Sequence, residues 1–246
     1  MRLAMAFANE EEAVKGFRRL IEVGIGGILY YGGLLLRYQA QEQGFKPSSV
    51  FGIYAGGNGS KLFHWAFGST FAENSVSANR LGEVFKTASG FDQTQIVIRL
   101  SEEPKSEVAY GLAAKDKDSS LTIAGPMAGL LPCEAYISGN AKADPNSWKK
   151  PLLIGDLRAQ GNGIRVDPDL PQFKQFLKAI GASLDSVQQM DLVANINMRL
   201  ASAFSGVRQA ANDQAAEKLM PRGEPLWVLA FKAYLEEQIH AWARSL

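Results

Sequence analysis

The feature that most limits what this chain can fold into is a glycine-rich turn between two regular segments. The apolar residues Val50–Ala55 predict a buried strand, and Lys61–Phe67 predict a helix. The turn between them reads Gly56-Gly57-Asn58-Gly59-Ser60. Glycine lets backbone N–H groups approach a ligand without a Cβ in the way, and a helix that opens after the turn adds a positive dipole end. Such a turn is typical of a site for a phosphate or another anion.

Two familiar glycine motifs do not fit this turn. A dinucleotide-binding fingerprint needs another glycine three residues after Gly59, where this chain has Leu62. A P-loop needs glycine, lysine and then serine or threonine, whereas Ser60 precedes Lys61 here. A tight turn with a purely structural role stays open as an alternative, because the strand must turn into the helix with or without a ligand.

A family resemblance starts at this turn. Residues Val50–Lys61, preceded by a predicted long helix over Glu11–Gln43, resemble the adenosine-side segment of the actin, heat-shock chaperone and sugar-kinase ATPase superfamily. Downstream, Pro104–Ala114 resembles the chaperone pattern Pro-x-Glu-x-Val-Ala-x-Gly-Ala-Ala, with Ser106 at the glutamate position. A β-branched run at Gln95–Leu100 predicts the core strand that precedes this second motif in the family.

The resemblance implies an α/β fold. Residues 1–115 are expected to form half of an actin-like, ribonuclease-H-like ATPase core, the adenosine-side lobe. Residues 116–246 are expected to add a β-containing insert and then a helical C-terminal region. The implied ligand is ATP or ADP, with Mg²⁺ held by the missing half of the cleft. The implied nucleotide contacts are Gly56, Gly57, Asn58, Gly59, Ser60 and Lys61.

The chain departs from the family in lacking the phosphate-gripping Asp-x-Gly-x-Thr turns. Asp92 and Asp156 are followed by other residues. We therefore expect the C-terminal, nucleotide-binding portion of an actin-like or chaperone-like ATPase, with no catalytic residue and no hydrolysis of its own. Its expected partner is the missing N-terminal lobe or another protein. The alternative is a non-enzymatic interaction or scaffold module that retains the half-core.

A third hypothesis is a small-molecule enzyme that uses Ser60 and His64, which lie one helical turn apart. A nucleophile and its base also need an orienting acid and an oxyanion site, and the sequence identifies neither. No metal site is predicted, because two histidines and one cysteine lie far apart in the sequence.

The composition of the chain bears on its expected binding partners and on its expected cellular compartment. The net charge of +1 gives no basic footprint for nucleic acid. The single cysteine, Cys133, excludes an internal disulfide and indicates a reducing compartment, so a cytoplasmic location without a signal peptide is predicted. The uncharged stretch Val23–Leu36 has about 14 residues, fewer than the ~20 of a spanning helix, so no membrane span is expected.

Other segments carry structural predictions. Glycines within the long N-terminal helix indicate that a neighbouring element packs very close to it; they are Gly24, Gly26, Gly27, Gly32 and Gly33. Four short strands are predicted between residues 116 and 168. Helices are predicted over Ala78–Thr87, Ser106–Lys115, Pro171–Ile180 and Ser186–Asn212, and from Pro225 onward.

Overall fold

A computed structural model describes residues 2–44, 46, 48–67, 71–72, 75–101, 129–130, 135–137, 152–153, 164–209 and 226–245. By its internal contacts the chain divides into two compact units, each described by itself. Unit 1 comprises Met1–Ile123 and Gln238–Leu246, and unit 2 comprises Ala124–Glu237.

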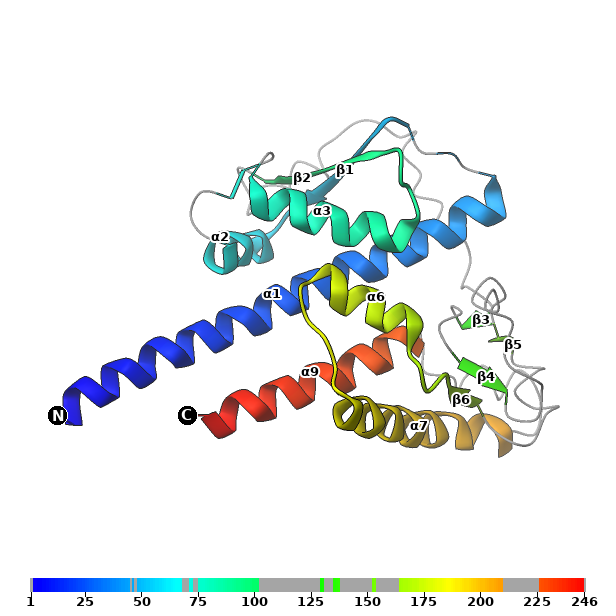
Figure 1. Cartoon of the computed structure of the whole chain (residues 1–246). Helices are drawn as coiled ribbons and strands as arrows, with labels where there is room; N and C mark the ends of the chain where they lie inside the picture. Colours follow the sequence, from blue (N-terminus) through cyan, green and yellow to red (C-terminus); the bar gives the residue numbers. More distant parts are fainter. Residues whose placement is uncertain are drawn as a thin grey trace. The chain divides into compact units, whose positions relative to one another are not determined.

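The described residues of unit 1 up to position 101 form a long helix, two strands and two further helices, apart from one 3₁₀ turn (Figure 1). Strand β1, helix α2 and strand β2 have the predicted bounds, whereas α1 begins nearer the N-terminus than predicted and α3 is longer at both ends. The elements are α1 (Arg2–Gln43), β1 (Val50–Ala55), the 3₁₀ turn η1 (Asn58–Ser60), α2 (Lys61–Phe67), α3 (Val76–Ser89) and β2 (Gln95–Leu100).

Strands β1 and β2 form a parallel pair whose register runs from Val50 opposite Gln95 to Ala55 opposite Leu100. One face of the pair packs on the helices, because side chains of a strand alternate between its two faces. On that face Phe51 stacks on Phe85 of α3 with ring centroids 5.6 Å apart. The core combines residues of α1, α2, α3 and β2 with the segment between the helices: Ile25, Leu29, Phe63, Ala66, Phe71, Ala78, Leu81 and Ile98.

Two glycines of α1 face α3. A Cβ on Gly32 would make an ordinary contact, 3.7 Å from Cε2 of Phe85, and Gly33 lies closer still. A Cβ on Gly33 would lie 2.7 Å from both the Cβ of Ala88 and the carbonyl oxygen of Phe85. A Cβ on Gly24 would meet nothing within 4 Å. The prediction of a closely packed neighbour is therefore confirmed at Gly33 and wrong at Gly24.

The last turns of α9 (Leu226–Ser245) belong to unit 1 and contact α1. The indole Nε1 of Trp242 donates a hydrogen bond to the carbonyl oxygen of Ala13 at 3.0 Å. The ring of Phe17 lies 5.7 Å from the Trp242 ring and 5.5 Å from the Trp65 ring of α2. This aromatic cluster joins residues 13–17 to residues far along the chain.

Unit 2 contains two short antiparallel strand pairs and helical segments (Figure 1). Strand β3 (Gly129–Leu130) pairs with β5 (Leu152–Leu153), and β4 (Ala135–Ile137) pairs with β6 (Ile164–Val166). Side chains of α6, α7 and α9 form its core, with Phe173, Phe176, Leu177, Leu192, Ile196, Ala233 and Tyr234 buried. The helices are α6 (Pro171–Ala179), α7 (Ser186–Gln209) and the part of α9 that ends at Glu237.

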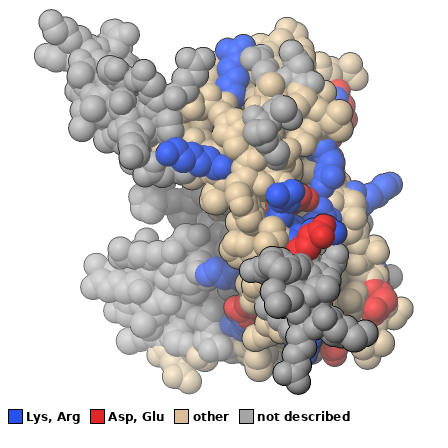
Figure 2. Space-filling view, turned by 90° about the vertical axis from the view of Figure 1, so that its left-hand side faces the viewer, with Lys and Arg blue, Asp and Glu red and all other residues tan. Residues whose placement is uncertain are grey.

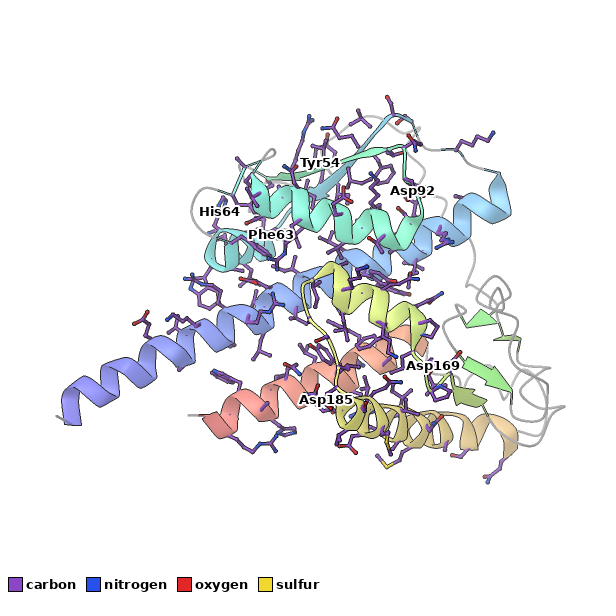
Figure 3. The ribbon with its side chains drawn as sticks, viewed as in Figure 1. Tyr54, Phe63, His64, Asp92, Asp169 and Asp185 are labelled. Carbon is purple, nitrogen blue, oxygen red and sulfur yellow. The ribbon has the colours of Figure 1, made fainter. Side chains whose placement is uncertain are left out.

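Local capping sets the ends of α6 and α7. Gly181 adopts a left-handed φ of 71°, and the N–H groups of Gly181 and Ala182 donate to the carbonyl oxygens of Lys178 and Leu177. This Schellman motif ends α6 at the predicted glycine. Asp185 and Gln188 exchange backbone-to-side-chain hydrogen bonds of 2.8 and 3.1 Å, a capping box that opens α7 (Figure 3).

Several predictions lie outside the described residues. These are the chaperone-like motif at residues 104–114, the helix over Ser106–Lys115, Cys133 and the division of the chain between residues 115 and 116. The described residues are mostly helical with a small two-stranded parallel sheet. The actin-like half-core stays a prediction.

Helix α1 is more apolar over a longer stretch than the sequence analysis predicted. Between Ala13 and Arg37 its 25 residues are long and apolar enough to cross a membrane, by length and composition only. One face of this stretch packs inside unit 1, with Val23, Ile25 and Leu29 buried, and a core helix passes the same test. The absence of a membrane span stays a prediction.

Candidate functional site

The glycine turn lies at the carboxyl end of β1. Ser101, the residue that follows β2, donates its backbone N–H to the carbonyl oxygen of Ala55 at 3.0 Å, so the two strands end side by side. In open α/β sheets, ligands bind outside the carboxyl ends of parallel strands. The turn therefore occupies the edge of the sheet where a ligand site is expected.

The turn is tight and internally bonded. Gly57 has a left-handed φ of 67°, a conformation that strains residues with a Cβ. Both the backbone N–H and the hydroxyl of Ser60 donate to the carbonyl oxygen of Gly57, at 3.1 and 2.9 Å. The Ser60 side chain, 4% exposed, thus holds the turn closed from inside.

The structure requires glycine at position 57 but not at position 59. The backbone of Gly57 requires glycine through its φ, although a Cβ there would meet nothing within 4 Å. At Gly59 the backbone is not left-handed, and a Cβ would again meet nothing within 4 Å. Among the described residues of unit 1, neither conformation nor packing requires a glycine at Gly59, so its surface is open there to a molecule that approaches the backbone.

The predicted contact residues do not all face the same way. Gly56, Gly59 and Lys61 are exposed, whereas Ser60 is buried. The side chain of Asn58 lies outside the described residues. The Ser60 hydroxyl donates to Gly57 and not to His64, whose side chain is exposed on α2 (Figure 3). This geometry gives no support to a Ser60–His64 nucleophile and base.

Tyr54 and Arg99 form a pair beside the turn that the sequence analysis missed. They are register partners on β1 and β2, on the strand face turned away from the helix core. Arg99 Nη1 donates to the Tyr54 hydroxyl at 3.2 Å, and its guanidinium carbon lies 5.9 Å from the centre of the ring. Because 45 residues separate the two, only the register of the parallel strands could have revealed the pair.

A concave surface lies at the end of β2 away from the glycine turn. It is a hollow of about 360 Å³ that includes the turn between α3 and β2, where Figure 3 labels Asp92. Within it Lys86 pairs with Glu83 at 3.8 Å. The lining residues are Asn79, Gly82, Glu83, Lys86, Asp92, Gln93, Thr94, Gln95 and Ile96. This hollow does not include the glycine turn.

The described residues form neither a basic patch on the face shown in Figure 2 nor a metal-binding cluster. On the face shown in Figure 2, the described Lys and Arg side chains are spread over the surface, some beside acidic ones, and do not gather in one patch. No cluster of three or more His, Cys, Asp or Glu side chains suited to a metal occurs in the part of the chain that the structure describes.

Comparisons with known proteins found no relative. No protein-family model matches the chain, and neither a curated protein nor a solved structure matches it.

Proposed function

We propose that this chain carries the adenosine-side wall of an actin-like or chaperone-like nucleotide site, and that the phosphate-binding and catalytic wall comes from elsewhere. The ligand is ATP or ADP, and the contact segment is Gly56–Lys61. The proposal follows the family resemblance of residues 50–61 and 104–114. On its own, the chain binds nucleotide weakly and does not hydrolyse it.

The observation that carries the proposal is the exposed backbone at Gly59. This glycine follows the carboxyl end of a parallel strand, and neither its backbone conformation nor any described neighbour within 4 Å requires glycine there. A ligand that touches the backbone would explain the missing side chain. A purely structural turn explains Gly57, through its left-handed φ, but leaves Gly59 unexplained.

The Tyr54–Arg99 pair adds a second feature that suits a nucleotide. An aromatic ring offers a stacking surface for a base, and an arginine adds a planar cation that stacks on aromatic faces. Both side chains are exposed next to the turn. Lys61, exposed at the start of α2, adds a second positive charge.

Amide chemical shifts during titration with ADP, at concentrations up to the millimolar range, test the proposal on the full chain. The expected result is a saturable change confined to Gly56–Lys61 and the ends of β1 and β2. Gly59→Ala should weaken binding at least tenfold without changing stability, since its methyl group has room in the free protein. Gly24→Ala is the matched control, because it also adds a methyl group in open space but lies on α1.

Four results would overturn the proposal. One is the absence of any amide chemical-shift change at the highest millimolar concentration of ADP. Another is a set of chemical-shift changes centred away from the turn. A scaffold module would instead tolerate both Gly57→Ala and Gly59→Ala with a change of stability at most. Steady-state ATP turnover that is abolished by changes at Gly57 would contradict the claim that the catalytic parts lie elsewhere.

A further inference from the structure

The hydrogen bonds of β1 leave one edge of that strand open. The carbonyl oxygens of Ser49 and Ala55 accept from Gln95 and Ser101 of the neighbouring strand, at 2.8 and 3.0 Å. Backbone groups alternate between the two sides of a strand, so odd-numbered residues of β1 face β2. The N–H and C=O groups of Val50, Gly52 and Tyr54 therefore point away from β2. Of these groups, the carbonyl oxygen of Val50 accepts a hydrogen bond from the Ser48 hydroxyl at 2.5 Å and keeps one lone pair for another donor. Among the described strands, β1 pairs with β2 alone.

Within residues 48–55 this open edge carries none of the protections that a strand can supply itself. Natural edge strands avoid pairing through charged side chains, proline or bulges. Residues 48–55 include no charged residue and no proline, and the register with β2 runs without a bulge. Val50 is 50% and Tyr54 is 72% exposed, whereas Val97 and Ile98 of β2 are 7% and 1% exposed. Because Val50 and Tyr54 are exposed, the edge of β1 is suited to accept another strand.

The sequence of β1 is self-complementary about Gly52. In an antiparallel pairing centred on this glycine, Val50 of each strand lies opposite Tyr54 of the other. On the opposite face, Phe51 lies opposite Ile53. Each pairing joins an aromatic with a β-branched side chain, a favourable cross-strand combination. No charge is brought next to another charge within the paired segment.

We propose that β1 pairs antiparallel with β1 of a second copy of this chain, about a two-fold axis at Gly52. The pairing extends two parallel pairs into one continuous four-stranded sheet. A two-fold arrangement uses the same patch on both copies and closes on itself. Two-stranded sheets are marginal in water, and added strands stabilise them. The interface uses residues 50–54. It leaves the proposed nucleotide contacts at residues 56–61 free and shares only Tyr54 with the features that suit a nucleotide.

The mass of the full chain in solution tests this pairing, with sedimentation equilibrium as the measurement. The expected mass is twice the 26.7 kDa of one chain. Gly52→Pro removes an N–H that points away from β2 and is compatible with an edge strand, so it should yield monomers. Gly52→Ala keeps this N–H and should remain dimeric; its Cβ would lie 3.3 Å from the exposed Tyr54 ring, which can turn aside.

Charge complementation keeps the test informative if the proline variant fails to fold. One variant carries Val50→Lys with Tyr54→Lys, and a second carries Val50→Glu with Tyr54→Glu. Each should be monomeric alone because like charges face each other, and a mixture should form a one-to-one heterodimer. A wild-type monomer at hundred-micromolar concentration would overturn the proposal. So would a dimer that survives Gly52→Pro, or a mixture of charged variants that stays monomeric.

Discussion

Gly33 of α1 lies directly against Ala88 of α3, so that a Cβ on Gly33 would come within 2.7 Å of the Ala88 Cβ. The same added atom would lie 2.7 Å from the carbonyl oxygen of Phe85, which is backbone and cannot turn aside. Gly33→Ala should therefore force the two helices apart and lower the free energy of unfolding by about 1–3 kcal/mol. Urea denaturation followed by circular dichroism measures this change.

Gly24→Ala is the matched control for Gly33→Ala, because it makes the same substitution on the same helix. Nothing lies within 4 Å of a Cβ at Gly24. Alanine favours helix over glycine by about 1 kcal/mol, so this variant should be as stable as the wild type or more so. Equal losses of stability in the two variants would show that α3 does not pack against Gly33.

Trp242→Phe tests the attachment of the last helical turns to α1. The substitution keeps a ring near Phe17 but removes the Nε1–H that donates to Ala13 at 3.0 Å. The expected loss of stability is about 0.5–1.5 kcal/mol, the usual net value of one hydrogen bond. Gly16→Ala should cost more, since its Cβ would lie 2.3 Å from Cδ1 of Trp242. Thermal unfolding of the full chain that is unchanged in both variants would refute this contact.

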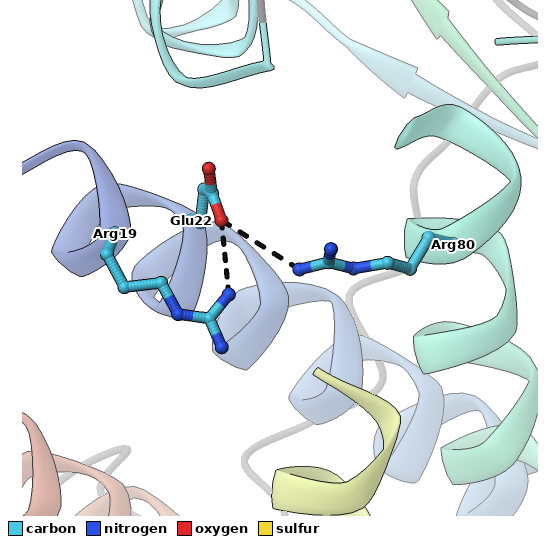
Figure 4. A network of polar contacts seen from close by, with 3 residues as sticks. All are labelled: Arg19, Glu22 and Arg80. Carbon is cyan, nitrogen blue, oxygen red and sulfur yellow. Dashed lines mark hydrogen bonds and ion pairs between the residues drawn. The ribbon is translucent and has the colours of Figure 1, made fainter. Parts of the chain in front are cut away.

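Glu22 links α1 to α3 through two arginines (Figure 4). Its Oε2 atom lies 3.1 Å from Arg19 Nη1 and 3.8 Å from Arg80 Nη2. Because the arginines are partly exposed, Glu22→Gln should lower stability by only about 0.3–1 kcal/mol, and the difference should shrink in molar salt. Glu11→Gln on the same helix breaks only the exposed pair with Lys15 and should have no measurable effect. A loss for Glu22→Gln that is insensitive to salt would contradict an electrostatic link.

Glu237 should make unit 2 less stable as the pH rises. Burial, and then the nearby charge of Asp191, raise the pKa of this carboxyl above its ordinary value of 4.5. The folded chain therefore holds the proton where the unfolded chain has released it, and the contribution of Glu237 to stability falls as the pH rises through the raised pKa. Glu237→Gln should stabilise the chain at pH 7 and leave it unchanged near pH 3. Denaturant unfolding curves at both pH values measure the difference in the free energy of unfolding. A Glu237→Gln variant less stable than the wild type at pH 7 would contradict the prediction.

The segments that the sequence predicted best are those in which near neighbours set the structure. The β-branched and apolar runs of β1 and β2 gave the strand bounds, and the spacing of Phe173, Phe176 and Leu177 gave the buried face of α6. Gly44, Gly90 and Gly181 have left-handed φ values where helices end. Hydrophobic periodicity and capping act within one or two turns, so they can be recognised without knowing what lies across the fold.

For the candidate site, residue order alone identified the glycine turn but not its surroundings. The left-handed Gly57 is a local property of a strand that must turn into a helix. That the Ser60 hydroxyl closes the turn, and that Arg99 stands beside Tyr54, depends on how the segments fold together. The open space around Gly59, on which the proposed ligand contact rests, also depends on how these segments pack.

Residue order accounts for the elements of this protein because secondary structure follows from interactions between close neighbours along the chain. The folded arrangement alone establishes that Gly33 is enclosed while Gly24 is open, and that the edge of β1 at Gly52 is unpaired among the described strands. These properties arise from the pairing register between β1 and β2 and from the packing of α3 against α1. Both are contacts between segments that lie more than 40 residues apart, and no local pattern encodes their alignment.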